Sequence, residues 1–157
     1  KICETAGVAG DSRVKSLEHK SAEAVYKAIT QVKIMNPPTN CLTPIGESLI
    51  EKSLKKEIGE AQFFKSVTRP PAVYRGNPFQ IEVGVALGGS LPADEPARFM
   101  RFANRVPLQY QAGACAMTKA MTSINWKAYG LSQPRGSAPT GPVIFMVHIA
   151  SVAPEFT

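Results

Sequence analysis

The chain has 157 residues, of which 44% are hydrophobic and 19% charged, so it can bury one ordinary core or one core and part of a second. It contains no run of about 18 apolar residues and no basic cap on an apolar stretch, which argues against a membrane span and a signal peptide. The net charge of +6 favours a phosphate-rich partner or an anionic surface, although charge alone does not choose between them. Cys3, Cys41 and Cys115 are odd in number and far apart, which predicts free thiols in a reducing cytoplasm.

Both ends of the chain resemble internal positions of a longer polypeptide. Lys1 is not a start methionine, and residues 2–6 look like the last turns of a helix that stops near Gly7. At the other end, residues 154–157 follow an apolar strand directly. We therefore expect a fragment of a larger protein.

The beginning of the chain predicts two helices joined by a polar loop. Residues 9–16 form the loop, and residues 16–34 carry apolar side chains at helical spacing. The proline pair at residues 37–38 ends the second helix, because residues before proline avoid the α region. We place a domain boundary there, with residues 1–36 in one domain and residues 37–157 in the other.

The loop of this helical hairpin is a candidate DNA-binding element. Arg13 and Lys15 lie in or beside it, and Lys20 belongs to the helix that follows. Amides and cations between two such helices are typical of phosphate contacts. The same pattern fits a plain helical hairpin with a solvated loop, so both interpretations stay open.

A further helix is predicted to begin at Thr43-Pro44 and to run through Lys56. Threonine supplies a capping oxygen, and proline suits the first helical position. Its apolar stripe consists of Ile45, Leu49, Ile50 and Leu54. Glu47 is interpreted as a solvated carboxylate near the positive end of the helix.

After an extended segment, the hydrophobic period becomes that of a strand. Large side chains alternate with small or polar ones over residues 79–87, which predicts that the large-residue face packs against a layer. Residues 99–110 predict a second strand, bent near Pro107, whose polar face carries Arg101 and Arg105.

The rest of the chain adds a helix over residues 111–123 and a strongly apolar, internal strand over residues 143–151. From residue 43 onward, the predicted order is helix, strand, strand, helix, strand. Mixed order with neighbouring strands indicates an α+β fold, a two-layer sandwich.

Two other groups of residues are candidates for contacts with phosphate. Arg69 and Arg75 bracket an extended segment and either bind phosphate or pair with acids of the same domain. Trp126, Lys127 and Tyr129 lie within four residues. An aromatic pair around a lysine can contact a DNA backbone, or it can anchor a helix-to-loop corner and leave the lysine in water.

Residues for catalysis or metal binding are not evident in the sequence. His19 and His148 are interpreted as surface or packed side chains, without ligands at metal-binding spacing. No phosphate-binding loop, nucleophile elbow or paired-acid motif occurs. We expect no catalytic, cofactor-binding or metal site in this chain.

Several blocks together resemble one family, the B subunit of type IIB DNA topoisomerase (topoisomerase VI). The blocks are CLTPIGESLIEK from residue 41, TRPPAVYRGNPFQIEVGVALGG from residue 68, RFMRFANRVPLQY from residue 98 and NWKAYGL from residue 125. The last contains the family's WKxY signature. The chain departs from the family at Glu18, where a capping threonine is usual, at Asn77, where histidine is common, and over residues 152–157.

The resemblance implies a fold and a domain organisation. Residues 1–36 are similar to the C-terminal part of a helix–two-turn–helix module. Residues 37–157 are similar to most of the transducer, a split β-α-β architecture like that of a ribosomal protein. DNA contacts are then expected at Arg13, Lys15, Lys20, Trp126, Lys127 and Tyr129.

The implied function is coupling within an archaeal-like, cytoplasmic, nucleoid-associated enzyme that passes one DNA duplex through another. A GHKL-type domain, whose motifs this chain lacks, binds ATP and dimerises. A tyrosine of the partner protein, the A subunit of topoisomerase VI, cleaves double-stranded DNA with Mg²⁺. A lysine that reaches the ATP γ-phosphate is expected beyond Thr157. The full-length enzyme would therefore use ATP and Mg²⁺, whereas this fragment would bind neither and would be inactive alone.

Two other classes of function stay open. The chain fits a non-catalytic nucleic-acid-binding module of the ribosomal-protein or glycosylase type. It also fits a B-like scaffold of a DNA-cleaving complex that has lost its ATPase activity.

Overall fold

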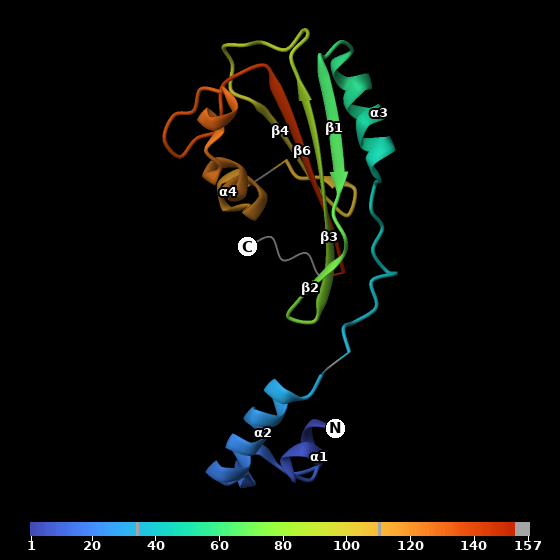
Figure 1. Cartoon of the computed structure of the whole chain (residues 1–157), viewed down its shortest axis with the longest axis vertical. Helices are drawn as coiled ribbons and strands as arrows, with labels where there is room; N and C mark the ends of the chain where they lie inside the picture. Colours follow the sequence, from blue (N-terminus) through green and yellow to red (C-terminus); the bar gives the residue numbers. More distant parts are fainter. Residues whose placement is uncertain (34, 110, 153–157) are drawn as a thin grey trace. The chain divides into compact units, whose positions relative to one another are not determined.

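The computed structural model describes residues 1–33, 35–109 and 111–152, which belong to two compact units, Lys1–Asn36 and Pro37–Thr157 (Figure 1). The first unit contains α1 (Ile2–Ala6), the 3-10 helix η1 (Val14–Ser16) and α2 (His19–Gln31). The second contains α3 (Glu47–Ile58), β1 (Phe63–Thr68), β2 (Ala72–Tyr74), β3 (Asn77–Leu87), β4 (Arg98–Ala103), β5 (Val106–Pro107), the 3-10 helix η2 (Ala112–Ala114), α4 (Ala116–Ser123), the 3-10 helix η3 (Trp126–Tyr129) and β6 (Val143–Ser151).

The first unit is a helical hairpin. The predicted stop of α1 is confirmed, because Gly7 adopts a left-handed conformation (φ 66°) and its N–H donates to the last turn. The second helix is shorter than the predicted 16–34, and Ile34 lies outside the described residues. Glu18 occupies the N-cap of α2 without a side-chain hydrogen bond. The helix α2 therefore begins without the side-chain cap that a threonine at this position could supply.

The second unit is built on one sheet with the strand order β1-β3-β6-β4-β5, and β2 pairs with β3 (Figure 1). The strand β3 is antiparallel to both of its neighbours in this order, β1 and β6, whereas β4 runs parallel to β6. The β-α-β unit is β4–α4–β6, and its two parallel strands are adjacent, with no strand between them. The strongly apolar β6 is internal, as its composition predicts.

Sequence reasoning missed β1 and β2. The short runs FFKSVT and AVY show no clean alternation of apolar and polar residues, so periodicity alone does not reveal them. Both strands are defined by their pairing with β3: Ser66 lies opposite Gly84, and Val73 lies opposite Pro78.

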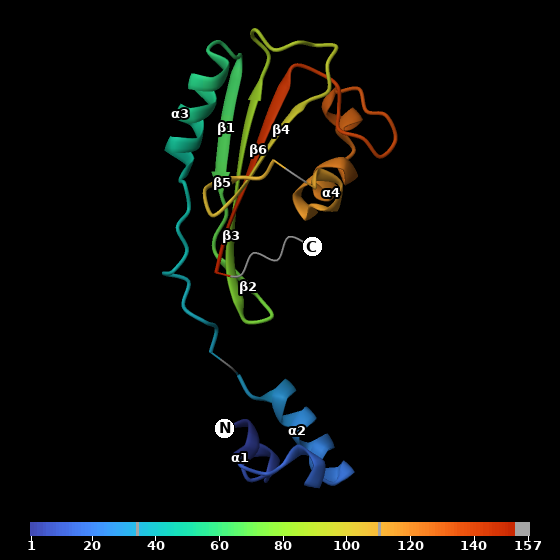
Figure 2. The ribbon, with the colours of Figure 1, turned by 180° about the vertical axis from the view of Figure 1, so that it is seen from behind.

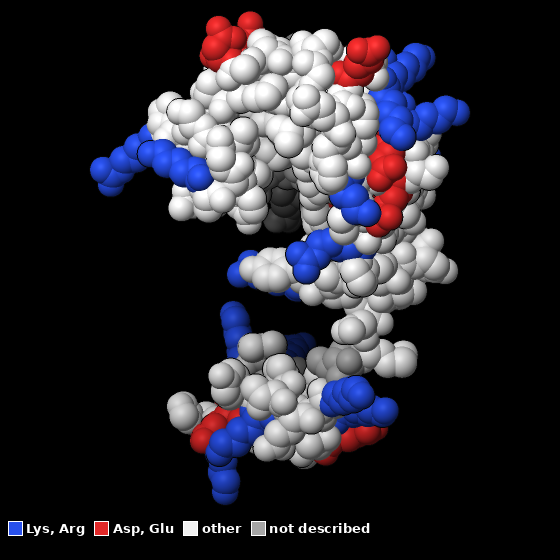
Figure 3. All heavy atoms as spheres, turned by 45° about the horizontal axis from the view of Figure 1, so that its top comes forward, with Lys and Arg blue, Asp and Glu red and all other residues white. Residues whose placement is uncertain are grey.

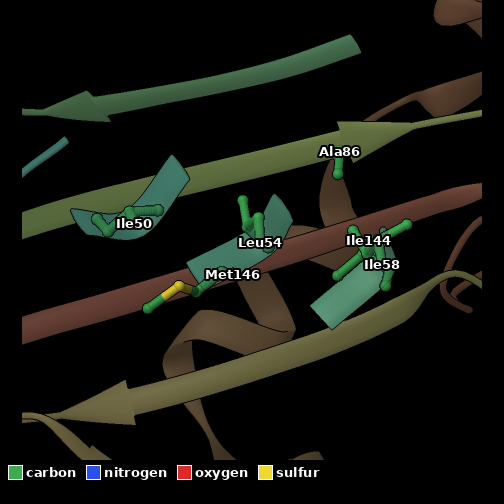
Figure 4. Close-up of a cluster of buried hydrophobic side chains, with 6 residues drawn as sticks. All are labelled: Ile50, Leu54, Ile58, Ala86, Ile144 and Met146. Atoms are coloured by element: carbon green, nitrogen blue, oxygen red, sulfur yellow. The ribbon is translucent and has the colours of Figure 1, made fainter. Parts of the chain in front are cut away.

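The helix α3 lies on one face of the sheet. Its apolar side chains Ile50, Leu54 and Ile58 point onto β3 and β6 and form a buried cluster with Ala86, Ile144 and Met146 (Figure 4). A Cβ on Gly84 would lie 2.6 Å from Ile50 Cγ2 and 2.8 Å from Leu54 Cδ1. The helix therefore sits this close to β3 because position 84 has no side chain.

The predicted orientation of β3 needs correction. Its more deeply buried face carries the small and polar residues Gln80, Glu82, Gly84 and Ala86. The large residues on the opposite face of the strand are half-buried or exposed. The predicted start of α3 is also wrong, since the helix begins at Glu47, after Gly46 at φ 91°. The backbone N–H groups of Ile45 and Gly46 donate to the Glu82 carboxylate, and these two residues precede the first turn of α3.

The predicted strand over residues 99–110 is a short hairpin. Asn104 and Arg105 both have positive φ, 46° and 68°, and they form the turn between β4 and β5. The bend is therefore at residues 104–105 rather than near Pro107, and Tyr110 lies outside the described residues. The predicted helix over 111–123 divides into η2 and α4, with Cys115 between them.

The opposite face of the sheet is partly covered by α4 and η3 (Figure 2). There Met121, Val143 and Phe145 are buried, and Trp126 packs against them. The alternation of β6 explains this arrangement, because Ile144 and Met146 face α3 while Val143 and Phe145 face α4. The α+β class is confirmed, with one difference: helices lie on both faces of the sheet instead of forming a single second layer.

Candidate nucleic-acid interface

Trp126 holds the corner between α4 and the loop that leads to β6. Its indole Nε1–H donates to the carbonyl oxygen of Met121 (2.7 Å), and its ring lies 4.5 Å from the Phe145 ring, centroid to centroid. Its backbone N–H donates to Gln133 Oε1 (3.0 Å). These contacts make Trp126 a structural anchor, which is the simpler of the two predicted roles.

Lys127 and Tyr129, the other two signature residues, are exposed on the same short helix η3. The Tyr129 ring is 5.9 Å from that of Trp126 and tilted by 54°, and 74% of the residue is exposed. Within the described part of the chain, the Lys127 ammonium has no hydrogen bond or ion pair to a side chain. The anchored tryptophan therefore presents an accessible lysine and an accessible aromatic ring.

A shallow depression of about 420 Å³ lies beside η3. Two of its described lining residues, Lys127 and Arg135, are basic, and none of them is acidic. Gln133 also lines it. Sequence reasoning overlooked Arg135 and Gln133, and the only available signal was their position in a proline- and glycine-rich loop.

The basic residues predicted for the first unit are all exposed. Arg13 is the N-cap of η1, and its carbonyl oxygen accepts from the N–H and the Oγ–H of Ser16. Lys15 belongs to η1, and Lys20 lies in the first turn of α2. The structure thus places these three cations on consecutive elements of the first unit, and it places Trp126, Lys127 and Tyr129 together in the second.

Arg101, which was predicted on the polar face of a strand, lies inside the fold. It is 7% exposed, and its Nη2 donates to the carbonyl oxygen of Leu108 (3.0 Å). Burial alone raises the pKa of the neighbouring Cys115 thiol. The Arg101 guanidinium and the N–H groups of Thr118 and Met117 outweigh that effect and lower it. Arg101 therefore acts inside the fold, and the described cysteines are free thiols, as predicted.

Arg69, Arg75 and Arg105 have mixed roles. Arg69 and Arg75 are exposed, and the Arg75 guanidinium stacks over the ring of Tyr74, 5.3 Å from its centroid. Arg105 donates from Nη2 to the carbonyl oxygen of Pro44 (2.7 Å), which ties the β4–β5 turn to the segment before α3. The prediction that Arg101 and Arg105 share the polar face of one strand is therefore wrong, because Arg101 is buried in β4 and Arg105 is exposed in the turn that follows it.

A buried pair, Glu82 and His148, occupies the centre of the sheet under α3. The residues face each other in neighbouring strands β3 and β6, both are 0% exposed, and His148 Nδ1 lies 2.7 Å from Glu82 Oε2. The carboxylate also accepts from the backbone N–H of Ile45 (2.6 Å) and Gly46 (2.7 Å) and from Thr68 Oγ1 (2.8 Å). Glu82 therefore joins β1, β3, β6 and the start of α3, and we call this set the Glu82 network.

The hydrogen bonds define the protonation of this pair. The N–H of Arg105 donates to His148 Nε2 (3.0 Å), so Nε2 carries no proton and Nδ1–H donates to Glu82. Burial alone raises the pKa of Glu82. The hydrogen bonds from Ile45, Gly46, Thr68 and His148 outweigh that effect and hold the pKa below its ordinary value. The network is thus an ionised carboxylate beside a neutral histidine.

Two carboxylates of α3 have a comparable structural role. Glu47 Oε1 accepts from the N–H of Thr68 (2.8 Å), and Glu51 Oε1 accepts from the N–H (3.2 Å) and Oγ–H (3.1 Å) of Ser66. Because β1 is an edge strand, one side of it has no neighbouring strand, and these carboxylates accept the N–H groups on that side. Glu47 is exposed in the first turn of α3, as predicted, and it also has a structural role as an acceptor for β1.

Surface charge alone does not locate a binding site. On the face drawn in Figure 3, lysine and arginine atoms stand in several separate groups, some interleaved with aspartate and glutamate atoms. Within residues 1–33, 35–109 and 111–152, no cluster of three or more His, Cys, Asp or Glu side chains could hold a metal ion. None of the helices described there is long and apolar enough to cross a membrane. The candidate site is consequently defined by local geometry at Trp126–Arg135.

Comparison with known proteins identifies the family. Residues 37–157 match the family model described as the topoisomerase VI B subunit, transducer. The chain is 50% identical over its full length to the B subunit of type 2 DNA topoisomerase 6 from Methanosarcina acetivorans, and 42% identical over 99% of its length to that of Archaeoglobus fulgidus. It spans 25% and 26% of those relatives. A solved gyrase B subunit of Myxococcus xanthus overlays with a TM-score of 0.38 and 17% identity, covering 63% of this chain and 27% of that one.

The matched segment coincides with the second compact unit. This unit holds the sheet, the Glu82 network and residues 126–135, which we call the Trp126 corner. The extended blocks that suggested the resemblance all lie inside it. The chain belongs to the topoisomerase VI B subunit family, and residues 37–157 are transducer sequence.

Proposed function

We propose that this chain couples ATP binding to DNA passage within an archaeal-type topoisomerase VI. In the whole protein, a GHKL-type domain would dimerise on binding ATP, and the A subunit would cleave double-stranded DNA. The chain would transmit the nucleotide state between them, in the cytoplasm and associated with the nucleoid. The first unit, residues 1–36, would be the C-terminal part of a helix–two-turn–helix module.

The observation that carries this proposal is the Glu82 network. A coupling element must move as one body, since a soft element would absorb a displacement instead of passing it on. A single buried carboxylate connects two neighbouring strands, the edge strand and the start of α3, and Arg105 connects the β4–β5 turn to Pro44. Such a fully satisfied network of buried polar groups favours one rigid arrangement.

ATP and Mg²⁺ would act elsewhere in the whole enzyme. The described residues offer no donor set for a metal, and none of the sequence blocks cradles a phosphate chain. The residues present therefore do not fit either group. We expect no ATP turnover by this chain alone, and measured turnover by the purified 157 residues would contradict that expectation.

Direct DNA contacts are proposed at Arg13, Lys15, Lys20, Trp126, Lys127 and Tyr129. Lysine and arginine contact phosphates and position a protein on the duplex without reading sequence. An exposed aromatic ring beside Lys127 adds a surface for the sugar–phosphate backbone. Trp126 would contribute mainly by holding Lys127 and Tyr129 in place.

Fluorescence anisotropy with a labelled duplex, repeated over a salt series, tests the DNA contacts. We expect weak binding whose logarithm falls linearly with the logarithm of salt concentration, because bound cations release counterions. Changing Lys127 to Gln should weaken binding and flatten that dependence. A salt-independent signal, or no binding at low salt, would contradict the proposal.

Coupling is tested in the complete heterotetramer, in which the full-length form of this chain is combined with its DNA-cleaving partner. Thr68→Val removes one hydroxyl donor from Glu82 and keeps the shape of the side chain. We expect ATP hydrolysis to continue while relaxation of supercoiled DNA slows, because the two activities communicate through this network. The control Thr140→Val lies outside the network, and an equal loss of both activities in Thr68→Val would argue against coupling.

A further inference from the structure

Arg135 is held at the tip of a tight turn next to the WKxY signature. The N–H of Ser137 donates to the carbonyl oxygen of Pro134 (3.2 Å), and Gly136 has φ 72°, the geometry that a type II turn requires at its third residue. At the base of this loop, the N–H of Thr140 donates to the carbonyl oxygen of Ser132 (2.6 Å). The loop is therefore closed at its base and folded at its tip, which fixes the backbone of Arg135.

Gln133 attaches this turn to α4 and η3. Its Oε1 accepts from the N–H of Trp126 (3.0 Å), and its Nε2 donates to the carbonyl oxygens of Thr122 (3.3 Å) and Ser137 (3.1 Å). Because an N–H only donates and a carbonyl only accepts, these bonds fix the orientation of the amide. One half-buried side chain thus connects the Arg135 turn to the first residue of the helix that carries Lys127.

The C-terminal end of α4 borders the same depression, and its negative pole could in principle repel an anion. Three carbonyl oxygens at that end already accept hydrogen bonds: Met121 from the Trp126 indole, Thr122 from Gln133, and Ala120 from the Ser123 hydroxyl. These bonds reduce the negative partial charge that an approaching phosphate would meet. The charged side chains that line the depression are then Lys127 and Arg135.

We propose that Lys127 and Arg135 together bind the backbone phosphates of duplex DNA, and that Gln133 is the positioning residue for Arg135. The proposal rests on the DNA contacts proposed above and extends them to a residue outside the WKxY signature. The guanidinium presents paired N–H donors to phosphate oxygens, while the Lys127 ammonium acts as a point charge. Two cations lining one depression would thus hold a single stretch of backbone.

The first test compares Arg135→Gln with Lys119→Gln, which removes the same charge from an exposed site on α4 that does not line the depression. Anisotropy with a labelled duplex is measured over a salt series for the 157-residue chain. Arg135→Gln should weaken binding several-fold and reduce the slope of log K against log salt by about 0.9, the value for one phosphate contact. Lys119→Gln should change both quantities less.

The second test addresses positioning. Gln133→Leu keeps both cations and removes the attachment, so it should reduce the slope as much as Arg135→Gln does. The double variant Gln133→Leu/Arg135→Gln should bind no more weakly than Arg135→Gln alone. Trp126 fluorescence and thermal melting establish that each variant is folded. If Gln133→Leu does not fold, Gly136→Val strains the turn instead, in a position with open space around the Cβ.

The outcomes separate this inference from the proposed function. If the unaltered chain and Lys127→Gln behave as proposed while Arg135→Gln equals Lys119→Gln, DNA binding stands and the site with Arg135 is refuted. If the unaltered chain does not bind the duplex, both fail. If Arg135→Gln loses as much affinity for poly-glutamate as it loses for duplex DNA, the assignment to DNA phosphates is overturned. Additive losses in the double variant would overturn the positioning role of Gln133.

Discussion

The Glu82 network and the Trp126 corner use charged residues in opposite ways. At the centre of the sheet, a carboxylate and a histidine are both 0% exposed, and hydrogen bonds satisfy the carboxylate from four donors. At the corner, Lys127 and Arg135 are exposed and line an open depression. The first arrangement holds strands and a helix together, whereas the second leaves positive charge accessible to a ligand.

The comparison shows that residue type does not decide a role. Arg101 and Arg135 are both arginines in the second unit, yet one is buried beside Cys115 and the other is exposed on a turn. Burial raises the cost of an unsatisfied charge, so buried charged groups are surrounded by partners. Exposed cations keep their full hydration and exchange it for a phosphate at low cost.

The largest expected effect on stability follows from removing the Glu82 carboxylate. Glu82→Gln places an amide NH₂ or a neutral oxygen where two backbone N–H groups, Ile45 and Gly46, donate to a carboxylate. We expect a loss of about 2–4 kcal/mol in the free energy of unfolding, measured by urea denaturation. The matched control is Glu57→Gln, which removes an exposed pair with Arg98 and should cost about 0–1 kcal/mol. Equal losses of unfolding free energy in the two variants would show that the buried carboxylate contributes no more to stability than the exposed one.

The close approach of α3 to β3 gives the second prediction. Gly84→Ala adds a methyl group within 2.6 Å of Ile50 and 2.8 Å of Leu54, both of which are buried and cannot move into solvent. Thermal and urea unfolding should report a destabilisation of about 1–3 kcal/mol. Gly113→Ala, in open space and without positive φ, should leave stability nearly unchanged. A neutral Gly84→Ala would mean that α3 can shift away from the sheet.

Acidic pH should reduce the stabilisation that the Glu82 network provides and leave the contacts around Trp126 unchanged. Because hydrogen bonds hold the pKa of Glu82 below its ordinary value, its stabilisation is complete above that ordinary pKa. It is lost as the pH falls below the ordinary value and through the lower folded pKa. The free energy of unfolding, measured from neutral pH into this acidic window, should fall less steeply in Glu82→Gln than in the unaltered chain. Parallel curves would assign the acid sensitivity to other groups.

The smallest energetic effect is expected at the corner. Lys127→Gln should change the free energy of unfolding by no more than about 0.5 kcal/mol, as is usual for exposed substitutions. It should reduce the salt slope of DNA binding by about 0.9, since one phosphate contact is removed. Paired urea and anisotropy measurements on the same sample check both statements. A stability loss comparable to that of Glu82→Gln would make Lys127 a structural residue.

Much of the element assignment was predictable from the sequence. The end of α1 at Gly7, the strand over residues 79–87 and the apolar β6 all follow from local spacing, glycine or proline placement. The failures occurred where tertiary contacts compete with local preference. The start of α3 moved to Glu47 because the amides of Ile45 and Gly46 donate to a carboxylate 36 or 37 residues away.

The amino-acid sequence by itself determined the family, the α+β class and the position of the WKxY signature, because these depend on residues close together along the chain. Only the tertiary structure decided which charges are buried and which are accessible. Glu82 and His148 are 66 residues apart, and they meet because β3 and β6 pair in one particular register. Gln133 likewise gains its role from Trp126 and Thr122, since a hydrogen-bond partner is set by the folded path of the chain rather than by neighbouring letters.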